Sequence, residues 1–183
     1  RSEGGLSFRS YESVQDERTS LVIPAEGKLR FDKYLSLAFD FKDRGGADHF
    51  GYIARIIIGS ETSVDVVMNN PVNQDPFICI IKDGRLPSKI HPDKLIRLSE
   101  WNRVSIELTV NDGLLDVSEN GQQVASGLSL PGTREYTVTF GANHELGFST
   151  SDVAPFMVRN ISISVSPGSG NYNWSLEYPS SSD

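Results

Sequence analysis

The stretch WNRVSIELTVNDGLLDVSENGQQVASG, from Trp101 to Gly127, decides the fold. Apolar and polar residues alternate along Arg103–Val110, which is the period of a strand with one buried face. Asn111-Asp112-Gly113 and Asn120-Gly121 interrupt the alternation with residues that tolerate positive φ in tight hairpin turns. The stretch therefore predicts two successive hairpins, in which Leu114–Ser118 pairs with Arg103–Val110 and with Gln122–Ala125.

The same alternation recurs along the chain, and helical patterning is nearly absent. We expect the alternating apolar residues to form one core: Leu35, Leu37, Phe39, Phe41, Tyr136, Val138, Phe140, Ile161, Ile163 and Val165. Trp101 begins an alternating strand and is assigned to the same core. His91–Arg97 is the one candidate for a single helical turn. The pattern predicts an all-β, antiparallel sandwich.

Length and composition fit one domain. A sandwich of 183 residues needs no division into two units. Residues 1–166 are predicted to form the sandwich. The Gly- and Ser-rich segment 167–183 reads as an exit from the domain, or as the start of a neighbouring module, with Trp174 either folded back or leading onward.

Charge and cysteine content exclude several classes of function. The net charge is −7, and the 17 Lys and Arg residues are scattered singly, so nucleic acid is not an expected partner. No apolar run has the length of a membrane span. Cys79 has no second cysteine with which to pair and lies in the apolar run Phe77–Ile81, where a buried thiol acts as a small hydrophobic group.

Three motifs, in order, carry a family resemblance. Trp101–Leu108 resembles the W-x-x-V-x-x-x-L strand of laminin G-like and concanavalin A-like lectin sandwiches, and Leu114–Gly121 is similar to the strand that follows. Phe140–Asn143, with Pro155-Phe156 and Arg159–Ile163, resembles their closing strands, although Val158 and Arg159 stand where a Gly is common. The resemblance covers roughly residues 6–165 and implies a jelly-roll sandwich.

Members of these lectin-like families mostly bind glycans or proteins, as modules of larger surface proteins that include bacterial ones. The resemblance therefore implies a secreted, periplasmic or cell-surface recognition module that binds carbohydrate. A structural spacer or sensor domain that contacts other domains of its own chain is the alternative, and a jelly-roll glycoside hydrolase is the third reading. These are expectations from analogy of fold.

Catalysis is not expected from the residues. Glycoside hydrolysis needs two carboxylates about 5 Å apart for retention, and alternate positions of a strand would supply them. The acids of Asp40–Asp43, Glu107–Asp112 and Asp116–Glu119 lie at unsuitable spacing or in turns. The histidines, at positions 49, 91 and 144, are too far apart in sequence to predict a zinc site. We therefore predict that the chain is not an enzyme.

Calcium is a candidate ligand, because rims of sandwich folds offer it Asp, Asn and backbone oxygens. The resemblance places Asp48 at the position of an aspartate that some laminin G-like domains use; a turn-forming Asp is the alternative reading. Candidate ligand-binding residues in the connections are His49, Tyr52, Asn69, Asn70, Asn143 and His144. Amides and imidazoles hydrogen-bond to sugar hydroxyls, and Tyr52 offers a flat ring unless it packs against the sheet.

Overall fold

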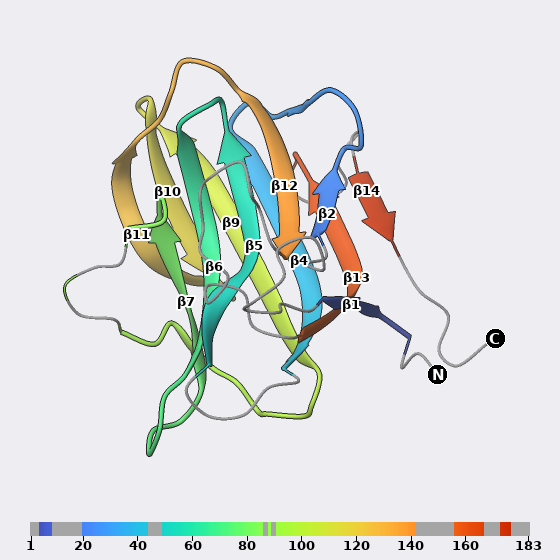
Figure 1. Ribbon diagram of the computed structural model, residues 1–183. Helices are drawn as coiled ribbons and strands as arrows, with labels where there is room; N and C mark the ends of the chain where they lie inside the picture. Colours follow the sequence, from blue (N-terminus) through green and yellow to red (C-terminus); the bar gives the residue numbers. More distant parts are fainter. Residues whose placement is uncertain are drawn as a thin grey trace.

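The computed structural model describes residues 4–8, 20–43, 49–85, 88, 91–141, 156–166 and 173–176. These residues form two antiparallel sheets packed face to face (Figure 1). The described residues contain strands and turns without a helix, and hence no helix suited to crossing a bilayer. The all-β sandwich predicted from the alternation is confirmed.

The first sheet, called sheet A, has the order β1-β13-β4-β9-β10-β11, with β14 also paired to β13. Its strands are β1 (Leu6–Phe8), β4 (Tyr34–Asp43), β9 (Asn102–Asn111), β10 (Leu114–Glu119), β11 (Gln122–Ser129), β13 (Phe156–Ser164) and β14 (Asn173–Leu176). Strand β14 lies in the segment predicted to leave the domain, and it extends this sheet through its pairing with β13.

The second sheet, called sheet B, has the order β2-β12-β5-β6-β7-β8, with β3 also paired to β12. Its strands are β2 (Ser20–Ile23), β3 (Leu29–Arg30), β5 (His49–Ile58), β6 (Thr62–Asn70), β7 (Phe77–Lys82), β8 (Lys94–Leu95) and β12 (Glu135–Gly141). Strand β8 replaces the helical turn predicted over His91–Arg97. Asp93 fixes this segment to the sheet edge, because its amide donates to the Ile78 carbonyl at 3.0 Å and its carboxylate accepts from the Ile80 amide at 2.7 Å.

Both hairpins predicted from the central stretch are present. Leu114 pairs with Asn111 in one hairpin, and Glu119 pairs with Gln122 in the other. The turn residues Asp112 and Asn120 have φ of 51° and 48°, and the glycine that follows each of them also has positive φ. Two successive positive φ values match the twist of the flanking strands, which explains the Asp-Gly and Asn-Gly pairs.

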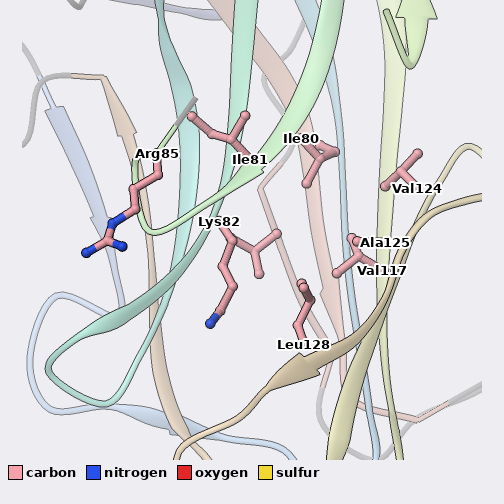
Figure 2. A pocket seen from close by; sticks show the side chains of 9 residues that line it. Ile80, Ile81, Lys82, Arg85, Val117, Val124, Ala125 and Leu128 are labelled. Carbon is pink, nitrogen blue, oxygen red and sulfur yellow. The ribbon is translucent and has the colours of Figure 1, made fainter. Parts of the chain in front are cut away.

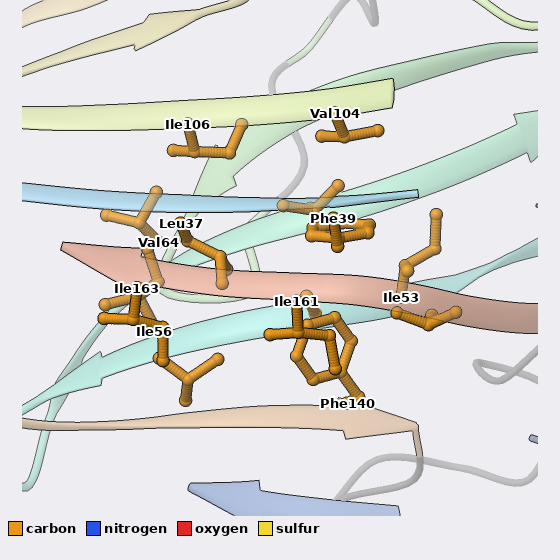
Figure 3. Packing of buried hydrophobic residues seen from close by; sticks show 14 of the residues in the cluster. Leu37, Phe39, Ile53, Ile56, Val64, Val104, Ile106, Phe140, Ile161 and Ile163 are labelled. Atoms are coloured by element: carbon orange, nitrogen blue, oxygen red, sulfur yellow. The ribbon is translucent and has the colours of Figure 1, made fainter. Parts of the chain in front are cut away.

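The core lies between the sheets, where the alternating side chains interdigitate (Figure 3). Leu37, Phe39 and Ile106 of sheet A are fully buried against Ile56 and Phe140 of sheet B. The rings of Phe39 and Phe140 meet edge-on, with centroids 5.1 Å apart, in a geometry that aromatic quadrupoles favour. The alternation therefore identified the buried face of β4, β9, β12 and β13.

Trp101 is an exception, and its assignment to the core is wrong. It is partly buried outside the core, where the Arg159 guanidinium carbon lies 4.0 Å from its ring centroid and the Lys42 ammonium 5.8 Å. The sequence contained the reason, since Trp101 has the same parity as Arg103 and Ser105. Those residues point away from the core, whereas Val104 and Ile106 point into it.

Candidate functional site

A surface groove of about 510 Å³ lies at the end of sheet B where β6, β7 and β8 meet. Asn69 is paired with Phe77, which is paired in turn with Leu95, so the three side chains form a row on one face of the sheet. Their strand neighbours Met68 and Ile78 are in the core. The row is therefore on the outer face, and Leu95 at its end is 58% exposed.

The connection between β6 and β7 forms one wall of the groove. It contributes Pro71, Gln74 and Asp75, and Pro92 approaches from the segment before β8. The amide of Ile96 donates to the carbonyl of Pro76 at 3.0 Å, which holds the β8 segment against the connection. The groove is thus built by two segments, the β6–β7 connection and the β8 segment, which a backbone hydrogen bond joins.

The chemistry of the groove combines an apolar floor with polar groups at its edge. Phe77, Leu95 and the two prolines offer apolar surface, whereas Asn69 and Gln74 offer amides that donate and accept hydrogen bonds. Asp75 adds an exposed carboxylate, and the described lining contains no Lys or Arg. Such a groove suits a neutral ligand with both hydroxyl groups and apolar C–H faces.

The structure separates two adjacent asparagines that sequence reasoning grouped together. Asn69 is half-buried and lines the groove. Asn70 is 3% exposed, because consecutive residues of a strand point to opposite faces. Asn69 is therefore positioned to meet a ligand in the groove, and Asn70 is not.

Tyr52 packs against sheet B and does not present an open ring. It is 5% exposed and forms a second apolar cluster on the outer face with Val67, Phe77, Cys79 and Ile81. Its hydroxyl donates to the Gly84 carbonyl at 3.1 Å, and the Arg55 guanidinium lies 5.2 Å from its ring centroid. The structure therefore agrees with the interpretation that Tyr52 packs against the sheet and does not offer its ring to a sugar.

Three predicted site residues, Asp48, Asn143 and His144, lie outside the described residues. His49 begins β5 and pairs with Asn70, with its backbone alone described. Among the described residues no group of three His, Cys, Asp or Glu side chains is arranged to hold a metal. Calcium binding at Asp48 stays a prediction.

A buried ionic network lies beside Tyr52 and was missed at the sequence level. The Arg55 Nε donates to Asp65 Oδ1 at 2.7 Å, and Nη2 donates to Asp65 Oδ2 at 3.1 Å. Asp65 Oδ2 also accepts from the Ser63 hydroxyl and from the Gly84 amide, at 3.1 and 2.8 Å. Burial raises the pKa of Asp65, against the lowering effect of Arg55 and Gly84. The network fixes the turn after β7 onto the outer face.

The missed residues differ in how far the sequence could have revealed them. Gln74 and Asp75 lie in the polar connection that follows Asn69 and Asn70 in the sequence. The polar character of that connection could therefore have identified them as candidates. Arg55 and Asp65 each interrupt an apolar strand with a charge, which is a signal of a buried pair. Leu95 and Pro92 carry no such signal, because only the pairing of β7 with β8 brings them to Asn69.

Comparisons with known proteins show the fold and no close relative. No family model matches the sequence, and no curated protein matches it. Among solved structures, an enzyme of polysaccharide lyase family 18 has a TM-score of 0.52 at 10% identity, over 96% of this chain and 90% of that one. An alginate lyase from a Chlorella virus has a TM-score of 0.51 at 12% identity, over 86% and 82% of the two chains.

A heptameric pentraxin from Limulus polyphemus also matches, with a TM-score of 0.47 at 13% identity over 88% of this chain and 76% of that chain. The two lyase structures and the two antiparallel sheets show that the chain has a jelly-roll sandwich of the concanavalin A-like type, as predicted. The narrower resemblance to laminin G-like domains and the role as a bacterial surface module stay predictions.

The prediction that the chain is not an enzyme is wrong as a conclusion from this fold. Both lyase structures described above, with TM-scores of 0.52 and 0.51, are named as enzymes. The sequence argument excluded one arrangement of carboxylates, which is the arrangement for glycoside hydrolysis. That argument did not address other chemistries, such as the lyase activity for which these two neighbours are named.

Proposed function

We propose that this chain interacts with a neutral polysaccharide, which it holds in the groove between Asn69 and Leu95. The observation that carries the proposal is the groove itself, with an apolar floor, two amides and a carboxylate that converge on one open site. Sugars need this combination, because their C–H faces bind apolar surface and their hydroxyls bind fixed polar groups. A secreted, periplasmic or cell-surface location is part of the same proposal.

The charge of the groove supports a neutral ligand. Asp75 contributes a negative charge, the described lining contains no cation, and the whole chain has a net charge of −7. An anionic polysaccharide such as alginate would meet like charge at the site and over the rest of the surface. The fold that this chain shares with an alginate lyase therefore does not carry the ligand class with it.

The test measures retention on polysaccharides by affinity electrophoresis, with laminarin as a neutral probe and alginate as an anionic one. We expect retention on the neutral polymer, and Asn69→Ala and Gln74→Ala should each weaken it about two- to tenfold, the value of one hydrogen bond. Gln123→Ala removes an exposed amide on β11 of the other sheet and is the matched control.

Retention that survives both groove substitutions would overturn the proposal, as would a preference for alginate. Sugar products released during the same incubation distinguish catalysis from binding alone. The ligand-contacting roles of His49, Asn143 and His144 stay predictions, and Ala substitutions at these positions belong in the same experiment.

A further inference from the structure

A second pocket opens at the edge of the sandwich, between β7 of sheet B and the β10–β11 hairpin of sheet A (Figure 2). Strand β8 pairs with Phe77 and Ile78 alone, so the rest of β7 is an edge within the described part of sheet B. Strand β11 is the edge of sheet A. The interior between the two edge strands is therefore accessible and contains a cavity of about 290 Å³.

The walls of this edge pocket are apolar and come from both sheets. They comprise Val64, Ile80, Val117, Val124, Ala125 and Leu128. Val64 and Val117 belong to the core cluster, and Ile80, Val124, Ala125 and Leu128 pack against it as partly buried residues. The cavity is thus continuous with the interior of the sandwich, and apolar groups that enter it leave water.

Two cationic side chains stand at the mouth of the edge pocket. Figure 2 shows the charged ends of Lys82 and Arg85 directed away from Val124 and Ala125. The Lys82 ammonium donates to the Ser129 hydroxyl at 3.1 Å and lies 3.3 Å from Asp83 Oδ2. Arg85 is exposed, and its guanidinium makes no hydrogen bond or ion pair with the residues that the structure describes. The charged groups that the structure describes at the mouth therefore sum to a positive charge, whereas the whole chain has a net charge of −7.

The backbone fixes where the Arg85 side chain begins. The Arg85 amide donates to the Lys82 carbonyl at 3.1 Å, and the intervening Asp83 and Gly84 have φ of 56° and 65°. Gly84 is itself bound by the carboxylate of buried Asp65. The turn that holds both cations at the mouth is thus attached to the buried network on the outer face of sheet B.

We propose that the edge pocket binds an aliphatic carboxylate, with its alkyl chain between the sheets and its carboxylate between Lys82 and Arg85. A volume of about 290 Å³ divided by roughly 30 Å³ for each methylene-sized group gives about ten groups. This corresponds to an alkyl chain of about eight to ten carbons. Guanidinium and ammonium groups both form charge-assisted hydrogen bonds with carboxylates. The edge pocket is separate from the groove between Asn69 and Leu95, since Phe77 in that groove and Lys82 in the pocket lie about 17 Å apart along β7.

The test is titration calorimetry of the whole chain with butanoate, hexanoate, octanoate, decanoate, dodecanoate and decanol. Each added methylene should raise the affinity about fourfold, and the gain should stop near ten carbons. Decanol should bind at least fivefold more weakly than decanoate. Arg85→Gln and Lys82→Gln should each weaken decanoate binding while leaving decanol unchanged, and exposed Arg97→Gln is the control.

A blocking variant separates the pocket from a general surface effect. Ala125→Leu adds three carbons to the wall at a partly buried edge position and should reduce the affinity for both decanoate and decanol. Equal binding of decanoate and decanol would overturn the anionic class of ligand. Absence of saturable decanoate binding, or binding that is unchanged by Ala125→Leu in a folded variant, would overturn the site.

Discussion

We expect Glu119 to make the stability of this protein dependent on pH near neutrality. It is the last residue of β10, lies on the strand face of Leu115 and Val117, and is 1% exposed. Neither of its side-chain oxygens has a hydrogen-bond partner among the residues that the structure describes. Burial raises the pKa of Glu119 from 4.5 to about 7; nearby Lys94 opposes the rise, and nearby Asp93 adds to it.

The sign and size of the effect follow from linkage. Below pH 4.5 the carboxyl group is protonated in both the folded and the unfolded chain, and it contributes no pH dependence. Between pH 4.5 and about 7 the unfolded chain loses the proton while the folded chain keeps it, so stability falls by about 1.4 kcal/mol per pH unit. The total loss above the folded pKa is about 3 kcal/mol.

Glu119→Gln removes the charge and keeps the shape. At pH 8 the variant should be more stable than the parent by about 3 kcal/mol, and at pH 4 the two should be nearly equal. Urea unfolding at several pH values from 4 to 8 measures the difference directly. Glu100→Gln, at a 60% exposed side chain, is the control and should show no such divergence. Parallel stability profiles for Glu119→Gln and the parent would refute the reasoning.

Four further predictions concern single positions. Asp65→Ala should destabilise the protein by about 3–5 kcal/mol, because it leaves Arg55 buried without its carboxylate. The control Glu135→Gln breaks the exposed ion pair between Glu135 and Arg30 and should cost less than about 1 kcal/mol; equal losses of stability in urea unfolding would contradict this. Burial raises the pKa of Cys79 to about 12, so a thiol reagent should label it only on unfolding, and rapid labelling of the folded chain would be inconsistent with that burial. Gly113→Ala should cost about 1 kcal/mol in urea unfolding through its φ of 75° alone, since no neighbouring atom obstructs a Cβ there; an unchanged stability would count against the strain. Trp101→Ala should cost about 1–2 kcal/mol, less than the roughly 3–5 kcal/mol of a core aromatic, and a loss as large as that of Phe39→Ala would restore Trp101 to the core.

The sequence by itself determined the local structure. Alternation selects which residues of a strand are buried, because successive side chains point to opposite faces whatever the partner strand is. The turns at Asp112-Gly113 and Asn120-Gly121 were predictable for a similar reason, since positive φ is a property of single residues. The outward position of Trp101 also follows from the alternation, because Trp101 has the same parity as the outward-facing Arg103 and Ser105.

The tertiary structure decided which strands are neighbours, and with them the candidate sites. Strand β4 lies between β13 and β9, so Asp40 accepts a hydrogen bond from Asn160 across 120 positions of sequence. The groove between Asn69 and Leu95 exists because β8 pairs with β7, and the edge pocket exists because that pairing ends after Ile78. Period-two alternation fixes the face of a strand and carries no information about its partner. Sites formed between strands distant in sequence therefore depend on packing that the alternation does not encode.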